Sequence, residues 1–380
     1  MSKIVITFIT HDVYLTGAPK LLLNLISLLK KTDEYYIALI IKEDKRDREN
    51  LSRDFKQLVS ETLVWKSEIK NGKLLKLRKL YHKYLQQKRD NKIQTLINKS
   101  DIIIANTITN GDFFDCFNFN KVRKCISYIH ELEIATEFFT NPKHLSVLVK
   151  KTDFYLVPSY AVANHLIKNL SIPNDKISLL NYYIPYQKND SLKSLDDEIF
   201  YIGILGTLDW RKGADILPVF IKSFFEKYPY KNIKFIWKGV NINTIQYKRI
   251  KYELDKINLS DQVIFETASL NTQDFFNKIK LHLSLAKEDP YPLVVLEAAS
   301  YHIPSLCFHG AGGAQEFIKN DAGATVPYLD LELLTEKIIY YKENENALVA
   351  SGKNAFEKFL NLHYQEKIIL QQFKNAINYK

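Results

Sequence analysis

The sequence predicts an α/β protein built from two doubly wound domains in series. The chain has 380 residues, whereas a single domain usually has about 100 to 200. Short apolar, β-branched runs alternate with helical patterns along most of the chain, as they do in parallel sheets. The polar stretch from Pro185 to Glu198 interrupts this alternation and is the expected linker. With 46% hydrophobic and 25% charged residues, the composition excludes wholesale disorder.

The first half begins with a strand, a loop and a helix. Ile4 to Thr10 is apolar and β-branched, a loop passes through Gly17, and leucines from Leu21 to Leu29 recur at helical spacing. Four further strands are expected here, at Tyr36 to Ile41, Ile102 to Ala105, Cys125 to His130 and Phe154 to Pro158. Buried strands that alternate with helices favour a parallel sheet.

A second α/β series follows the linker. Its expected strands are Ile199 to Leu205, Ile233 to Trp237, Val263 to Phe265, Leu281 to Ala286 and Ser305 to Phe308. Helices are expected at Ala214 to Tyr228, at Tyr247 to Ile257 and from Pro292, where a missing N–H costs little. We therefore predict domains at 1–188 and 189–361, with a final helix in 362–380 that packs back on the first domain.

Positive charge is concentrated in one segment of the first domain. The net charge is +10, and eleven Lys and Arg lie between Lys66 and Lys99 against only Glu68 and Asp90. Such an excess favours an anionic partner, but nothing beyond charge suggests nucleic acid. Apolar residues also recur here at helical spacing, at Leu74, Leu77, Tyr81, Tyr84 and Leu85. The segment is either a solvated helix face or a surface that docks on an anionic membrane.

The cysteines and the N-terminus indicate a cytoplasmic protein. Cys116, Cys125 and Cys307 form no CxxC pair, so neither a disulfide framework nor a zinc site is expected. The first residues run straight into a strand, and no stretch reaches the roughly 18 apolar residues that span a bilayer. Any membrane contact is therefore expected to be peripheral.

Two candidate site residues of the first domain lie where strands end. Ligands of doubly wound sheets bind at the carboxyl ends of strands. Gly17 lacks the further glycines of the dinucleotide fingerprint. It either forms a simple turn or allows a phosphate or sugar to come close to the N-terminus of the following helix. His130 is either a satisfied core histidine or a group that faces substrate.

Three motifs of the second domain suggest an anionic sugar ligand. Arg211 and Lys212, in a loop after the domain's first strand, are either a solvated pair or a binding site for a diphosphate. Glu297 lies among apolar helical residues, eight positions after Asp289, and a buried carboxylate needs a polar partner such as ribose hydroxyls. The glycine-rich loop 309–316 can hold an anion or sugar with its backbone N–H groups, although a flexible turn is the alternative.

In this order, the motifs resemble retaining glycosyltransferases of the GT-B fold, specifically glycosyltransferase family 4, over nearly the whole chain. The second domain carries G-x-L-x-x-R-K-G, acid-x7-Glu and GG-A-x-E, and the first adds the loop 15–19 and the strand end 128–131. Thr207 stands where the family often has Arg. Asp289 replaces the usual Glu, with Pro290 and Pro292 as in a D-P-[FY]-P variant of the family.

The resemblance implies metal-free transfer of a sugar from a UDP- or GDP-linked donor, with no bound cofactor. The domain 189–361 would bind the nucleotide-sugar, and the domain 1–188 would face the acceptor, a glycan or lipid-linked glycan of surface polysaccharide biosynthesis. The basic charge of residues 66–99, and not the resemblance, suggests contact with the inner face of the cell membrane. His130 and Asp289 would act at the sugar, Lys212 and Arg211 at the diphosphate, and Glu297 at the ribose. The other donor contacts would be Gly17, Ala18, Thr207, Thr267, Leu270, Pro292, Leu293, Val294, Gly312 and Gly313.

Two other functions compete with this one. Asp289 and Thr207 motivate an inactive partner or sugar-nucleotide-binding subunit on the same fold. A Rossmann oxidoreductase is disfavoured by the single glycine of the first loop.

Overall fold

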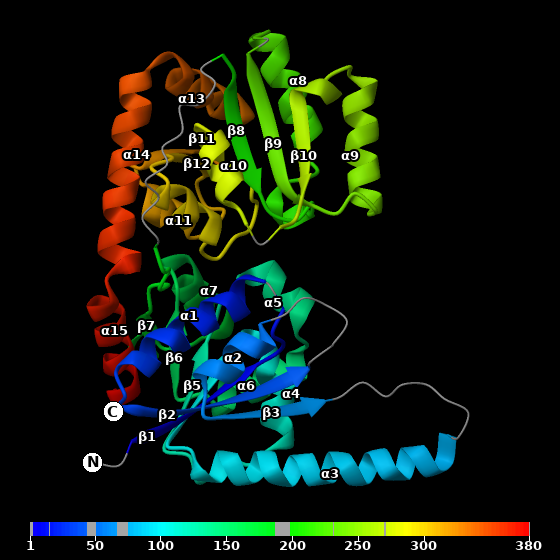
Figure 1. The fold of residues 1–380 in the computed structure, drawn as a ribbon, viewed down its shortest axis with the longest axis vertical. Coiled ribbons are helices and arrows are strands. Elements are labelled where there is room, and N and C mark those ends of the chain that lie inside the picture. The colour runs from blue at the N-terminus through cyan, green and yellow to red at the C-terminus, as the bar shows by residue number, and fades with distance from the viewer. Residues whose placement is uncertain are drawn as a thin grey trace. The chain divides into compact units, whose positions relative to one another are not determined.

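The chain forms two compact α/β units, seen in a computed structural model that describes residues 3–14, 16–43, 51–66, 75–186, 198–230, 232–269 and 271–379 (Figure 1). Unit 1 comprises Met1–Pro185 and Gln365–Lys380, and unit 2 comprises Tyr186–Tyr364. The predicted domain boundaries, after 188 and after 361, lie three residues from the ends of these units. No helix among the described residues is long and apolar enough to cross a membrane.

Unit 1 is built on a seven-stranded parallel sheet with the order β3-β2-β1-β4-β5-β6-β7. Its strands are β1 Ile4–Thr10, β2 Tyr35–Glu43, β3 Glu61–Lys66, β4 Ile102–Asn106, β5 Lys124–Tyr128, β6 Phe154–Val157 and β7 Ile177–Leu179. The edge strands β3 and β7 were not predicted, because both are only partly buried and lack a long apolar run. The strand predicted to reach His130 ends at Tyr128, because the chain leaves the sheet there and continues toward helix α5.

Helices flank this sheet (Figure 1). They are α1 Gly17–Lys31, α2 Ser52–Leu58, α3 Leu75–Lys99, α4 Gly111–Cys116, α5 Glu133–Phe139, α6 Pro142–Lys151, α7 Tyr160–Leu170 and α15 Glu366–Asn378, with a short 3₁₀ helix at Ile108–Asn110. The predicted leucines of α1 are buried. Helix α15 joins unit 1 through Glu366, which pairs with Lys31 and accepts a hydrogen bond from Tyr183 at 2.8 Å.

The apolar stripe predicted in the basic segment falls largely on residues whose side chains lie outside the described part of the chain. Helix α3 does form, from Leu75 to Lys99. Of the predicted stripe, Tyr84 is 61% exposed, so it does not belong to the core. Farther along the helix, Ile93, Leu96 and Ile97 are buried. Among the side chains of α3 that the structure describes, these three attach the helix to the core of unit 1.

Unit 2 is built on a six-stranded parallel sheet with the order β10-β9-β8-β11-β12-β13. Its strands are β8 Phe200–Leu205, β9 Ile233–Val240, β10 Val263–Thr267, β11 Leu281–Leu283, β12 Ser305–Phe308 and β13 Gly323–Val326. The strand predicted at 281–286 ends at Leu283, because the chain continues as a loop although Leu285 and Ala286 remain buried. The last strand, β13, was not predicted, since its four residues open with a glycine.

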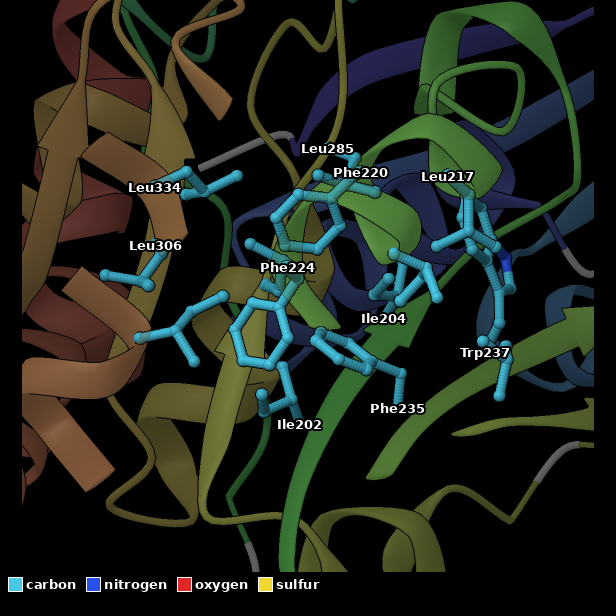
Figure 2. Packing of buried hydrophobic residues seen from close by; sticks show 14 of the residues in the cluster. Ile202, Ile204, Leu217, Phe220, Phe224, Phe235, Trp237, Leu285, Leu306 and Leu334 are labelled. Atoms are coloured by element: carbon cyan, nitrogen blue, oxygen red, sulfur yellow. The ribbon is translucent and has the colours of Figure 1, made fainter. Parts of the chain in front are cut away.

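The helices of unit 2 bury an aromatic core. They are α8 Leu217–Lys227, α9 Ile245–Lys256, α10 Gln273–Lys278, α11 Leu293–Ser300, α12 Ala314–Ile318, α13 Leu331–Glu343 and α14 Glu345–Phe359, followed by the π-helical turn Leu360–Tyr364. Figure 2 shows Phe220 and Phe224 of α8 near Phe235 of β9. The ring centroids of Phe220 and Phe224 lie 5.7 and 5.3 Å from that of Phe235. The helix predicted from Ala214 begins at Leu217, because the chain first turns through Gly213.

Candidate active site

Three loops of unit 2 meet at the carboxyl ends of neighbouring strands. They follow β8, β11 and β12, and backbone hydrogen bonds join them. Lys287 N donates to Arg211 O at 2.7 Å, linking the first two loops. Asp289 N donates to Ala311 O at 2.8 Å, linking the second and third. The structure thus brings together the three motifs that the sequence singled out in this half of the chain.

Lys212 and Asp289 form an ion pair at the centre of these loops. Lys212 Nζ lies 2.5 Å from Asp289 Oδ2, and Asp289 is only 9% exposed. Asp209 fixes the backbone of the loop after β8, because its Oδ1 accepts a hydrogen bond from Lys212 N at 3.1 Å. Its Oδ2 accepts from the hydroxyl of Thr207, so both oxygens of one carboxylate are used to fix the loop. The Lys212 ammonium is therefore positioned before any ligand arrives.

Gly213 allows this loop to pass close to the neighbouring strand end. Its φ is +75°, and an added Cβ would lie 2.0 Å from the carbonyl oxygen of Leu285. A side chain at this position is excluded by both the backbone conformation and the packing.

The remaining predicted residues of unit 2 occupy the same loops or the ends of nearby elements. Pro292 is the N-cap of α11, Leu293 and Val294 form its first turn, and Glu297 lies half-buried one turn later. Gly312 pairs with Asp289 in an isolated parallel bridge, and Gly313 N donates to Asp289 O at 3.1 Å. Arg211 is half-buried, and Thr267 is exposed at the end of β10. Leu270 lies outside the described residues.

The predicted residues of unit 1 meet around a buried histidine. His130 Nε2 lies 2.9 Å from Asn106 Oδ1, and its Nδ1 lies 3.1 Å from the hydroxyl of Tyr182. Asn106 Nδ2 in turn donates to the carbonyl oxygen of Ala18 at 3.3 Å. This chain of hydrogen bonds connects His130 to the start of α1, where Gly17 and Ala18 lie.

The same contacts define the protonation of His130. Because the amide nitrogen of Asn106 donates to Ala18, its oxygen is the atom that faces the imidazole. Nε2 therefore carries the hydrogen, and Nδ1 accepts from Tyr182. Burial, and secondarily the nearby His11, lowers the pKa of His130 to about 3. The imidazole is neutral at physiological pH and holds two neighbours in place.

We expect His130 to make stability depend on pH. The unfolded side chain binds a proton near its ordinary pKa of 6.5, whereas the folded one stays neutral down to a pKa of about 3. The stability that His130 contributes is therefore greatest above pH 6.5 and falls as the pH drops toward 3, by about 1.4 kcal/mol per pH unit. Denaturant titrations of His130→Asn should show a shallower loss of unfolding free energy on acidification. Equal slopes would contradict the assignment.

Three residues of this arrangement escaped the sequence analysis. Asn106 lies at the carboxyl end of a buried strand, which is the position that also marked His130 as a candidate. It was missed because the strand was predicted to end one residue earlier, at Ala105. Asp209 stands three residues before the Lys212 that it caps, which is a recognisable capping signal. Tyr182 has no local signal, because its contact with His130 spans 52 positions of sequence.

Sequence comparisons find glycosyltransferases. Residues 187–358 match the family described as "Glycosyl transferases group 1". A protein of Haemophilus influenzae named "uncharacterized glycosyltransferase" is 22% identical over 197 residues, which make up 49% of this chain and 53% of that protein. The chain thus aligns with about half the length of this curated relative.

Structural comparisons cover the whole chain. Anabaena HepE, solved in complex with UDP, matches with a TM-score of 0.78 and 16% identity over 99% of this chain and 100% of that one. The lipopolysaccharide outer core galactosyltransferase WaaB, in its apo form, matches with a TM-score of 0.69 and 13% identity over 98% and 99% of the two chains. These likenesses confirm the predicted GT-B fold of two Rossmann-like domains.

Proposed function

We propose that this protein is a glycosyltransferase that moves a sugar from a nucleotide-sugar donor to a glycan or lipid-linked glycan. The observation that carries the proposal is the ion pair of Lys212 with Asp289, where the loops after β8, β11 and β12 meet. These loops lie inside the segment that matches the glycosyl transferases group 1 family. HepE, which has the same fold, has been solved with UDP and with UDP-glucose.

The chemistry of the loops suits a diphosphate leaving group. On donor binding, phosphate oxygens would replace Asp289 as partners of Lys212, and the released carboxylate would be available to the sugar hydroxyls. Arg211 adds a second cation beside Lys212. Negative charge that develops on the leaving diphosphate would then meet cations already in position, which is the arrangement that stabilises a transition state most.

The other parts of the donor have candidate partners in the same unit. Glu297 would hold the ribose hydroxyls, and Thr267 with Leu270 would receive a uracil or guanine base. The backbone near Gly312 and Gly313 would contact the sugar. In unit 1, neutral His130 would face the sugar, while Gly17 and Ala18 would approach the phosphates.

We further assign the protein to glycosyltransferase family 4, with retention of anomeric configuration, no metal requirement and a role in surface polysaccharide synthesis. The sequence D-P-Y-P at 289–292 supports the family assignment. Lys212 and Arg211 supply the charge that a metal would otherwise provide. The name of WaaB places that protein in lipopolysaccharide synthesis. NMR analysis of the product anomer and turnover measured in EDTA test the mechanism; inversion or loss of activity in EDTA would contradict it.

Replacing Glu297 with Ala tests the function directly. A carboxylate that bonds ribose hydroxyls contributes about 1.5–3 kcal/mol, so we expect the donor KM to rise about 10- to 100-fold. The experiment first identifies the donor by a thermal-shift screen of UDP-, GDP-, ADP- and TDP-sugars, because a bound ligand stabilises the folded state. Glu336→Ala, on the surface of α13, is the matched control and should leave KM unchanged.

The rival, a catalytically inactive GT-B subunit, predicts a different outcome. Wild-type protein would then bind a sugar nucleotide in the thermal-shift screen but release no nucleoside diphosphate with any donor. Turnover by wild-type protein, with a raised donor KM in the Glu297 variant, would exclude the rival.

We also propose that helix α3 docks the enzyme on the anionic inner face of the cell membrane. Its described side chains include Lys83, Lys88, Arg89 and Lys92, and the basic charge continues toward the helix N-terminus. Each basic residue near an anionic surface contributes about 1 kcal/mol. Changing these four to Gln should reduce co-sedimentation with phosphatidylglycerol vesicles at low salt. Co-sedimentation that is insensitive to these changes would contradict the proposal.

A further inference from the structure

The loop that carries Asp289 is a stiff segment with few backbone hydrogen-bond donors. Pro290 and Pro292 flank Tyr291. A proline fixes its own φ, has no N–H to donate, and restricts the conformation of the residue before it. Asp289 and Tyr291, which precede the two prolines, are therefore both restricted. Whatever fixes the ring of Tyr291 also fixes Asp289 on one side and Pro292, the N-cap of α11, on the other.

The hydroxyl of Tyr291 is bonded to a buried histidine. Tyr291 Oη lies 3.0 Å from His363 Nε2, and the two ring centroids lie 5.5 Å apart. Burial raises the pKa of Tyr291, and the charge of Glu316 adds to this effect. The hydroxyl therefore keeps its proton at physiological pH and can donate it to an imidazole nitrogen.

His363 lies in the π-helical turn Leu360–Tyr364, at the end of unit 2. It is the buried one of the five residues of this turn and is only 1% exposed. Its neighbours Leu362 and Tyr364 are 39% and 40% exposed. One imidazole thus points inward from a segment whose adjacent side chains are exposed. Local π-helical turns occur frequently at functional sites.

The turn that carries His363 is itself held by other contacts. Lys358, near the end of α14, donates to the carbonyl oxygen of Phe317 in α12 at 3.1 Å. The ring centroid of Tyr186 lies 5.9 Å from those of both Phe359 and Tyr364. The turn is therefore attached to α12 through one side chain and to the start of unit 2 through another. An imidazole on such a turn is a fixed anchor for the Tyr291 hydroxyl.

His363 contacts both of the loops that meet at Asp289. It reaches the loop after β11 through Tyr291. It reaches α12, whose N-cap is Gly313 of the glycine-rich loop, through Phe317, with ring centroids 5.8 Å apart. The same two loops are bonded to each other where Gly313 N donates to Asp289 O. A change at His363 is therefore felt at Asp289 from two directions.

We propose that Tyr291 and His363 are positioning residues for sugar transfer, and that their hydrogen bond holds Asp289 in the orientation in which it meets the donor sugar. The inference rests on the proposed function and adds to it a residue that lies outside its three motifs. An apolar pair would fill the same space, but apolar contact is non-directional, whereas a hydrogen bond fixes the direction of the ring.

This role is separable from donor affinity. The backbone of Lys212 is fixed by Asp209. Glu297 lies on α11, which the buried side chains of Val295 and Leu296 attach to the core. Loss of the Tyr291 hydroxyl should therefore leave these donor contacts intact while it misorients Asp289. The expected signature is a lower kcat with little change in donor KM.

Kinetics of Tyr291→Phe in the full-length protein test this signature. Misplacement of a positioned group costs up to about 10²-fold in rate, so we expect kcat for nucleoside diphosphate release to fall about 10- to 100-fold, with donor KM changed less than about twofold. Tyr341→Phe is the matched control, because Tyr341 is buried in the same unit and its hydroxyl lies 3.1 Å from Ser351 Oγ. The control should leave kcat unchanged.

A double variant distinguishes positioning from stability. Tyr291→Phe alone takes the hydroxyl partner away from a buried imidazole, which is destabilising, whereas Tyr291→Phe/His363→Leu removes both partners and avoids that penalty. We expect the unfolding free energy, measured in denaturant, to recover in the double variant while kcat stays low. Recovery of kcat together with stability would show that the bond is only structural and would overturn the proposal.

Amide hydrogen exchange provides a readout that does not depend on turnover. In the protein without donor, the amides of Asp289 and Gly313 should exchange faster in Tyr291→Phe than in wild type, and at the wild-type rate in Tyr341→Phe. Unchanged exchange at these two amides would overturn the proposal even if kcat fell. If wild-type protein released no nucleoside diphosphate with any donor, the proposed function would fail, whereas exchange would still decide whether the bond holds Asp289.

Discussion

Replacing Lys212 with Ala is expected to lower kcat/KM for sugar transfer by about 10²- to 10³-fold, the usual cost of removing one preorganised group that stabilises developing negative charge. The ammonium group of Lys212 is paired with Asp289, and the Lys212 backbone is fixed by Asp209. Removing it leaves Asp289, which is 9% exposed, without its cation. That carboxylate would also repel the donor diphosphate. Steady-state kinetics of nucleoside diphosphate release measure the effect.

A matched control separates catalysis from the loss of an ion pair. Lys251 pairs with Asp255 at 2.8 Å on the surface of α9, in the same unit. Exposed pairs of this kind contribute little to stability because solvent screens them, so Lys251→Ala should leave both activity and melting temperature nearly unchanged. If Lys212→Ala retains more than about one tenth of wild-type activity, Lys212 does not bind the leaving group.

Gly213→Ala is expected to be the most destabilising substitution in the site. The new methyl carbon would lie 2.0 Å from Leu285 O, and the residue would also keep a φ of +75°. The loop would have to move, and Lys212 with it. We expect a loss of more than about 3 kcal/mol in unfolding free energy, within the range of strongly disruptive substitutions. Chemical denaturation measures the change.

Gly310→Ala provides the comparison that isolates the clash. Gly310 has a similar φ of +80°, but no atom lies within 4 Å of an added Cβ. The conformational strain alone should cost about 1 kcal/mol. Equal effects of the two substitutions would show that strain, and not contact with Leu285, makes glycine necessary at position 213.

Local pattern was enough to predict the buried strands and the motifs of the second half. Ser305 to Phe308 was predicted with its observed bounds, because a short apolar run between turns has few alternatives. Lys212, Asp289 and Gly312 were named separately from three motifs, and the parallel sheet brings them to one edge. That convergence follows from topology, since the carboxyl ends of parallel strands share an edge.

Features that depend on distant or partly exposed residues could not be predicted in the same way. The strand at Ile177–Leu179 has half-buried side chains and only three residues, so no periodicity marks it. The ion pair of Lys212 with Asp289 spans 77 positions and follows from no local rule. The hydrogen bond between Tyr291 and His363 joins segments 72 positions apart in the sequence, which no single motif contains.

The return of the last helix to unit 1 has a consequence for synthesis of the chain. Unit 2 is continuous in sequence, whereas unit 1 includes Gln365–Lys380. Helix α15 buries Ile369 and Phe373 and places Phe373 against Tyr35, with ring centroids 6.0 Å apart. On the ribosome, the N-terminal sheet must therefore wait for the final residues before this face is covered, although N-terminal domains generally fold first. Unit 2 is complete once Tyr364 has been synthesised. Unit 1 begins earlier but at that point still lacks Gln365–Lys380.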